Sequence, residues 1–205
     1  MLYITIPPFN VFDEATESFI SVSEPIDLEM ENSLWAIAEW EKKYKKPWFP
    51  DSKASKVIKD KQAERTPDEM LYFIRCMITN YKPNKIQDSW LSGLTEGNFK
   101  KITDYLQDPQ TALTHIPDVK PDKKKKKTPE VRMTSERIYA WMFELQMPLE
   151  VEFWNINRLM NTIQVINYDN TPDDRKGSGM KQAEIAQDYA KINEQRLKAL
   201  GKTKG

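Results

Sequence analysis

The sequence predicts a mainly α-helical protein with a small N-terminal β element. Apolar residues recur at three- and four-residue spacing through much of residues 32–169, as they do on one face of a helix. Residues 1–31 instead alternate apolar and polar side chains, as strands do. A thin apolar stripe among many charges in about residues 180–200 predicts a basic C-terminal helix that is mobile or forms on a partner.

The first 31 residues are expected to form an acidic, β-rich head. Residues 2–6 alternate and end at Pro7, and two further short alternating runs follow at 19–23 and 26–30. The whole of 1–31 carries seven acidic residues and neither Lys nor Arg. The head therefore has one sign of charge.

The first two helices have clear boundaries. A helix is expected to begin after Asn32 as its N-cap and to end before Pro47, followed by a polar connector that starts near Trp48. Residues 66–69, Thr-Pro-Asp-Glu, form a capping box with proline at the first helical position. This start signal predicts a second helix that runs to about residue 80.

Two shorter helices are expected near 86–91 and 95–106, and residues 32–116 together make the first helical part of the core. Residues 117–133 then lose all periodicity and include five consecutive lysines, Lys123–Lys127. We interpret this stretch as a linker. It has no aromatic residues between its lysines, which argues against stacking on nucleic-acid bases.

Residues 134–169 are expected to complete the core as a helical hairpin. Pro148 separates two apolar helices, because proline cannot continue a helix. Asn157 and Arg158 are the unusual polar residues in this segment, and we interpret them as structural polar ties. We expect Asn157 to bond to the backbone of a neighbouring element, and Arg158 to pair with an acid near residues 29–31.

Residues 170–205 are expected to form a hinge and then the basic C-terminal helix. The Gly-Ser-Gly at 177–179 follows a charged loop and lacks the flanking pattern of a phosphate-binding loop, so it indicates a hinge. From 175 to 205 eight basic residues oppose three acidic ones. This tail and the acidic head could pair, within one molecule or between copies, or both could be solvated.

No residue pattern indicates a catalytic, cofactor or metal site. His115 lies in a loop-like stretch with neither a second His nor a Cys nearby, and Cys76, the single cysteine, is expected to be buried in a helix. Pairs of carboxylates fall at turns and helix starts, where they cap backbone N–H groups. The absence of such patterns predicts a non-enzymatic protein without a cofactor. With zero net charge, no membrane span and no signal peptide, the protein is expected to stay in the cytoplasm.

Six tryptophans are many for 205 residues. Most lie on predicted apolar faces, and we expect Trp154 in particular to be buried. Trp48 and Trp90 are the better candidates for exposed contact anchors. Together with residues of the C-terminal tail they form the predicted partner-binding set: Trp48, Trp90, Arg175, Lys181, Tyr189 and Arg196.

Four segments carry a family resemblance: FISVSEPIDLEMENSLWAIAEWEKKYKKPW, TPDEMLYFIRCMIT, IYAWMFELQMPLEVEFWNINRLMNTIQVIN and NEQRLKALGKTKG. In this order they resemble small proteins encoded in the tail-gene region of tailed bacteriophages, generally described as tail assembly chaperones. The resemblance spans nearly the whole chain. It departs at Asn155, where relatives often have an aromatic residue or histidine, and in a longer connector at 53–65.

The resemblance implies a non-catalytic factor of a siphovirus-like phage that works in the host cytoplasm. Its partner would be the tape-measure or tail-tube protein, held until the tube polymerises. The opposite charges of head and tail add a further copy of itself as a second candidate partner. One alternative is a structural virion component, such as a connector or baseplate part, that remains in the particle. The other, an enzyme or nucleic-acid-binding regulator, is disfavoured by the missing motifs and the zero net charge.

Overall fold

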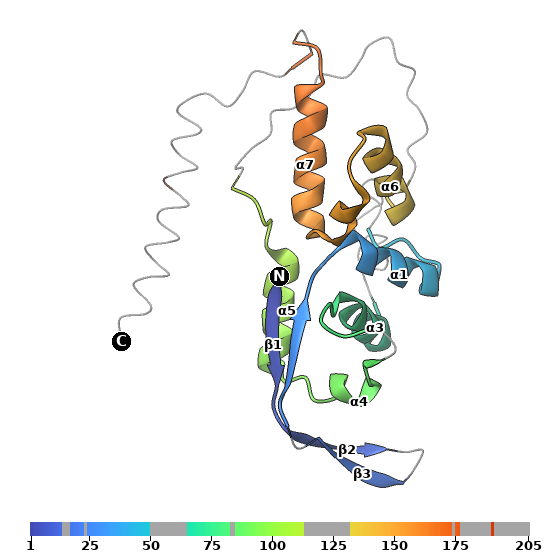
Figure 1. The fold of residues 1–205 in the computed structure, drawn as a ribbon, viewed down its shortest axis with the longest axis vertical. Coiled ribbons are helices and arrows are strands. Elements are labelled where there is room, and N and C mark those ends of the chain that lie inside the picture. Colours follow the sequence, from blue (N-terminus) through green and yellow to red (C-terminus); the bar gives the residue numbers. More distant parts are fainter. Residues whose placement is uncertain are drawn as a thin grey trace. The chain divides into compact units, whose positions relative to one another are not determined.

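The computed structural model describes residues 1–13, 17–22, 24–49, 65–82, 85–112, 132–173, 175–176 and 190 (Figure 1). The chain divides into two compact units. The first consists of Met1–Gln110 and Glu130–Met160, and the second of Thr111–Pro129 and Asn161–Gly205. Nearly all of the described elements belong to the first unit.

Two antiparallel strand pairs follow one another along a single hairpin. β1 (Leu2–Ile6) pairs with β4 (Ile26–Met30), and β2 (Phe9–Asp13) pairs with β3 (Ser18–Val22). Two consecutive prolines after β1 separate the pairs, because proline has no N–H to donate to a neighbouring strand. The strands expected at 2–6 and 26–30 are confirmed, whereas β2 was not predicted.

The helices confirm a mainly α chain with an N-terminal β element. They are α1 (Leu34–Tyr44), α3 (Pro67–Met77), α4 (Asp88–Leu91), α5 (Glu96–Gln107), α6 (Ser135–Glu144), the 3-10 helix η2 (Leu149–Phe153) and α7 (Ile156–Asp169). The α-helices other than α7 lie within a few residues of their expected positions, whereas η2 was not predicted and α7 begins later than expected after Pro148. None of the described helices is long and apolar enough to cross a membrane.

The caps show why two of these helices begin where they do. The capping box at α3 is confirmed, because the Thr66 hydroxyl accepts from the Glu69 N–H and the Glu69 carboxylate accepts from the Thr66 N–H, each at 3.2 Å. The N-cap of α1 is Ser33, whose hydroxyl accepts from the Ala36 N–H. The expected cap, Asn32, therefore lies one residue too early.

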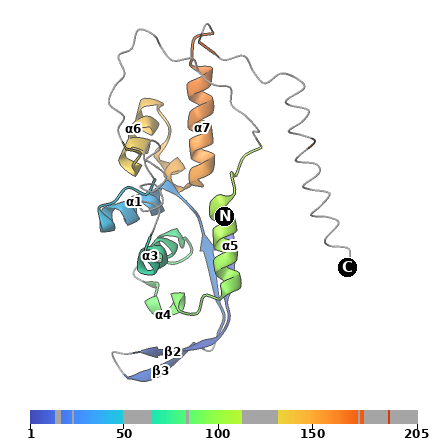
Figure 2. The same ribbon diagram turned by 180° about the vertical axis from the view of Figure 1, so that it is seen from behind.

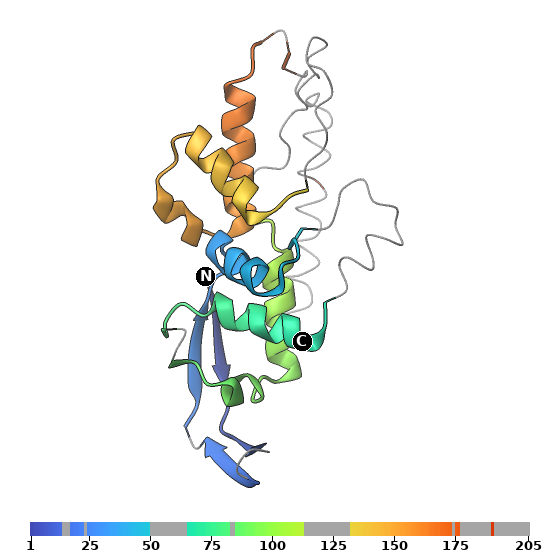
Figure 3. The same ribbon diagram turned by 90° about the vertical axis from the view of Figure 1, so that its right-hand side faces the viewer.

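One face of the β1–β4 pair packs into the core. The largest fully buried side chains come from β1, β4, α1, α3, α6 and α7: Ile6, Leu28, Met30, Leu34, Ile37, Trp40, Phe73, Ile74, Met77, Ile138, Met142 and Leu159. The expected packing of α1 against α3 and α6 is confirmed (Figure 3). The Trp40 indole N–H donates to the Glu69 carbonyl at 2.9 Å and joins α1 to α3. Helix α5 lies against β1 (Figure 2).

Trp154 is not buried as the sequence predicted, and two other aromatic side chains around Pro148 are exposed as well. Phe143 is 67% exposed, Phe153 55% and Trp154 36%. Residues after Pro148 form a short 3-10 helix, and Trp154 has extended backbone angles (φ −71°, ψ 158°). The helical spacing that predicted burial of Trp154 therefore does not apply, because α7 begins two residues later.

Several expectations fall outside the described residues. These are the mobile basic C-terminal helix, the glycine hinge at 177–179, the lysine run and His115. Three of the predicted partner-binding residues also lie there: Lys181, Tyr189 and Arg196. Arg175 is described, and it belongs to the second unit.

Candidate functional site

Trp48 is part of an aromatic cluster and is not the exposed contact anchor that the sequence predicted. Its ring stacks on Phe73 at a centroid distance of 3.8 Å and meets Trp40 edge-on at 5.0 Å. The Arg65 guanidinium lies over the same ring at 3.8 Å, and the Trp48 N–H donates to the Glu41 carboxylate at 2.6 Å. The expected exposure of Trp48 is wrong because Arg65 and Phe73, which are distant in sequence, cover its ring, while α1 supplies Trp40 and Glu41.

Trp90 lies at the edge of the surface that we regard as the candidate site. It is half-buried, and its ring meets Tyr81 edge-on at 5.1 Å. Tyr81 in turn forms part of a groove with a volume of about 370 Å³. We call it the aromatic groove; its walls and floor include Trp35, Cys76, Ile78, Tyr81, Lys82 and Phe153.

The aromatic groove borders an exposed apolar ledge, which we define as Leu149, Phe153 and Trp154. Phe153 belongs to both features, since its ring lies 6.4 Å from that of Trp35 in the groove. Large exposed apolar side chains that lie together mark sites of protein interaction more often than isolated ones do. The groove and ledge therefore form the strongest candidate site among the described residues.

Local structure places the ledge on the surface. Helix α6 ends at Glu144, and Gln146 just beyond it is in the left-handed region (φ 53°), which turns the chain toward Pro148 and η2. Buried Val151 anchors η2 on the protein, and the Tyr139 hydroxyl donates to Glu152 at 2.6 Å. Burial is the main cause of a raised pKa of Tyr139, and this bond to a carboxylate is the second cause. The remaining side chains of η2 face solvent.

A buried polar network holds the start of α7 beside the ledge. The Glu31 carboxylate accepts from the Asn155 side-chain amide at 3.1 Å, from the Tyr105 hydroxyl at 2.5 Å and from the Asn32 N–H at 3.0 Å. The amino group of Met1 lies 3.1 Å from the other carboxylate oxygen. Burial and the bond to Glu31 raise the pKa of Tyr105. These contacts connect the head, α5 and the residue that precedes α7.

The polar tie expected at Asn157 is present. Its side-chain amide donates to the Asp108 carbonyl at 2.7 Å and to the Leu106 carbonyl at 3.4 Å, at the end of α5. The side-chain oxygen of Asn155 accepts from the Asn157 N–H at 2.9 Å and so caps α7, a role that was not predicted. An Asn just before an apolar helical run is a recognisable N-cap signal that could have found it.

Arg158 makes a contact with an aromatic ring of the ledge. Its guanidinium lies over the Trp154 ring, 4.6 Å from the centroid. Such a cation–π contact is worth about 0.5–1 kcal/mol at an exposed site. The pairing of Arg158 with an acid near residues 29–31 stays a prediction, and Glu31 itself accepts from Tyr105 and Asn155. Arg158 therefore supports the ledge.

Cys76 lines the aromatic groove but is not a nucleophile. The thiol is buried, as the sequence predicted. Burial raises the pKa of Cys76 to about 11. The thiol is therefore neutral near pH 7, and a neutral thiol is neither a good nucleophile nor a metal ligand.

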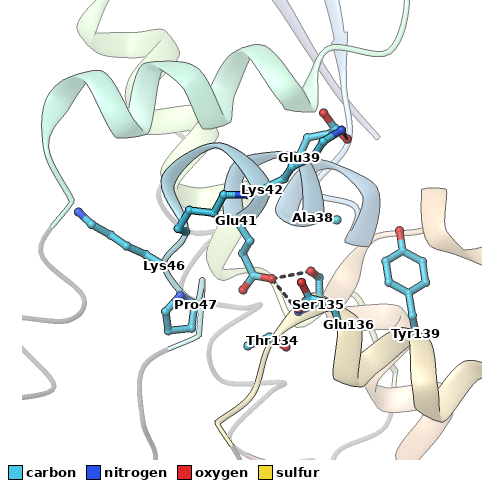
Figure 4. A pocket seen from close by; sticks show the side chains of 11 residues that line it. Ala38, Glu39, Glu41, Lys42, Lys46, Pro47, Thr134, Ser135, Glu136 and Tyr139 are labelled. Atoms are coloured by element: carbon cyan, nitrogen blue, oxygen red, sulfur yellow. Dashed lines mark hydrogen bonds and ion pairs between the residues drawn. The ribbon is translucent and has the colours of Figure 1, made fainter.

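A second hollow, of about 520 Å³, lies between α1 and the start of α6 (Figure 4). Glu41 occupies its inner side, where the carboxylate accepts from the Ser135 N–H at 2.7 Å and from the Ser135 hydroxyl at 2.5 Å. Glu41 thus already supplies the negative charge that the N-terminus of α6 favours. Lys46 at the rim pairs with Glu69 at 2.5 Å. We interpret this hollow as a structural joint.

Among the described residues, no group of His, Cys, Asp and Glu side chains is arranged to hold a metal ion. The described surface offers an aromatic groove and an apolar ledge on a helical frame, an arrangement suited to binding a protein segment. No protein-family model, curated protein or solved structure matches the chain.

Proposed function

We propose that the protein is a tail assembly chaperone of a tailed bacteriophage, which holds the tape-measure or tail-tube protein in the host cytoplasm before the tube polymerises. The family resemblance described above supports the class of function. The observation that carries it in the structure is the aromatic groove beside the exposed ledge, joined by Phe153. The groove and ledge together offer a surface for a protein client.

The shape of the groove favours an apolar helical segment as the client. Its rings come from three separate elements: Trp35 from α1, Tyr81 from the segment after α3, and Phe153 from η2. Rings held in this way can receive apolar side chains at helical spacing, the mode by which amphipathic helices bind grooves. Lys82 at the rim offers a positive charge to an acidic residue of the client.

Aromatic side chains dominate the free energy of such interfaces. Substituting Phe153→Ser and Trp154→Ser together should therefore abolish co-purification of the client with the tagged protein from infected cells. Phe99→Ser provides a matched control, because Phe99 is also exposed but lies on α5, outside the groove and ledge. Unchanged recovery of the tape-measure or tube protein with the double variant would contradict this placement of the client site.

The basic tail is the second proposed client contact, since the sequence places Arg175, Lys181, Tyr189 and Arg196 in or near it. Deleting residues 177–205 tests it in the same co-purification assay. Loss of client in the deletion variant, with the groove variant unaffected, would assign binding to the tail. Protein composition of purified virions separates a chaperone, which is absent from particles, from the alternative of a structural virion component.

A further inference from the structure

The β2–β3 pair forms an exposed arm with two aromatic rings on it. Phe12 and Phe19 are opposite each other in register, and their rings meet edge-to-face at 5.2 Å. They are 50% and 74% exposed. Within the described residues the arm is a sheet of two strands, and a two-stranded hairpin alone is marginally stable in water. Exposed rings on such a ribbon favour docking onto another surface.

The arm lies in the most acidic part of the chain. Residues 1–31 carry seven acids and no base, and the described acids Glu17 and Glu24 at the ends of β3 are exposed. At its base the arm is held by close contact of the Phe9 ring with Gly93. A surface that receives the arm must therefore combine positive charge with apolar or aromatic groups.

The same chain carries a surface of that kind between α1, α3 and α4. A groove of about 340 Å³, which we call the basic groove, is lined by residues that include Lys43, Tyr44, Leu71, Tyr72, Arg75 and Leu91. The Lys43 ammonium lies 3.7 Å from the centroid of the Tyr72 ring, and Tyr44 meets Tyr72 edge-on at 5.7 Å. One acid, Asp68, also lines it.

We propose that the acidic arm of one copy of this chain seats Phe12 and Phe19 in the basic groove of a second copy. Charge complementarity selects this occupant, since the arm and the groove carry opposite signs on a chain whose net charge is zero. Reciprocal exchange of two arms closes a two-fold dimer, the commonest oligomer. The arm and the basic groove share no residue with the aromatic groove or the ledge, so this dimer does not depend on the proposed function.

Light scattering coupled to size-exclusion chromatography of the full chain measures this association. The parent should form a dimer that weakens as salt is raised, because exposed charges are screened. Phe12→Ser with Phe19→Ser, or Lys43→Glu alone, should raise the dimer Kd by at least about tenfold. Lys101→Glu is the matched control, since Lys101 is exposed on α5 and outside the groove. Circular dichroism checks that each variant is folded.

Mixing the two kinds of variant gives the decisive result. An arm-defective copy keeps an intact groove, and a groove-defective copy keeps an intact arm. At a concentration between the Kd of the parent and that of the variants, each variant alone should be mainly monomeric, and the mixture should form a heterodimer through one intact arm and one intact groove. The proposal is overturned by a parent that stays monomeric up to its solubility limit, by variants that dimerise as the parent does, or by a mixture that remains monomeric. If Phe12→Ser with Phe19→Ser misfolds, Glu17→Lys replaces it in the mixture.

Discussion

Glu41 on α1 accepts two hydrogen bonds from Ser135, the first residue of α6, although 94 positions separate them in the chain. The carboxylate is buried and also accepts a hydrogen bond from the N–H of Trp48. One side chain thus caps α6 and fixes the start of the connector after α1. Because both elements pack on the core, this contact orders the frame that carries η2 and the apolar ledge.

The first prediction tests this contact. Glu41→Ala should lower the free energy of unfolding by about 2–4 kcal/mol, because it leaves buried donors on Ser135 and Trp48 without their acceptor. Urea denaturation followed by circular dichroism measures it. Glu39→Ala on the same helix is the control, since Glu39 makes a surface pair with Lys42 and should cost less than about 1 kcal/mol. Equal losses in the two variants would contradict the role of Glu41.

The second prediction contrasts two glycines. A Cβ added at Gly93 would lie 2.4 Å from the Phe9 ring and 2.7 Å from Ile6, whereas one added at Gly97 would meet nothing closer than 3.7 Å. Gly93→Ala should therefore destabilise the protein by about 1–3 kcal/mol through overpacking. Gly97→Ala, inside α5, should stabilise it by about 0.5–1 kcal/mol. Thermal unfolding of the two variants should show opposite shifts of Tm.

The third prediction concerns acid stability. The hydrogen bond from Lys46, together with the capping bond to Thr66, lowers the pKa of Glu69 below its ordinary value. A carboxylate with a depressed folded pKa contributes stability that is present above its unfolded pKa and is lost as the pH falls through the folded pKa. Glu69→Gln should lower stability at pH 7 and flatten its dependence on pH below about 4.5.

A second variant, Lys46→Gln, completes that experiment. It removes the main cause of the shift and should weaken the same pH dependence, while the double variant should lose little more than Glu69→Gln alone. Denaturant unfolding between neutral and acidic pH measures both. A Glu69→Gln variant with the same pH dependence as the parent would show that another group controls acid unfolding.

The fourth prediction separates an exposed tryptophan from a buried one. Trp154→Ala should cost about 1 kcal/mol, mainly through loss of the cation–π contact with Arg158. Trp40→Ala should cost about 3–5 kcal/mol, because Trp40 is 1% exposed and its indole N–H is bonded to α3. A Trp154 variant as unstable as the Trp40 variant would show that Trp154 supports the core and does not serve contact.

Much of the secondary structure follows from neighbouring residues alone. The capping box at 66–69, the alternation at 2–6 and 26–30, and the stop before Pro47 each depend on backbone groups a few positions away. Short-range hydrogen bonds and backbone sterics act within one or two turns, so a single sequence contains all that decides them. The tie at Asn157 was predictable for a similar reason, since a polar residue on an apolar helical face needs a partner.

Tertiary structure alone decided which charged and aromatic residues are buried. Glu31 and Glu41 look like surface acids in sequence, yet their partners Tyr105 and Ser135 lie 74 and 94 positions away. In the opposite sense, Phe153 belongs to an apolar run but is exposed, because η2 interrupts the helical period. Burial depends on which remote elements cover a side chain. The aromatic groove and the basic groove, each assembled from three elements, could therefore not be located before the helices were packed.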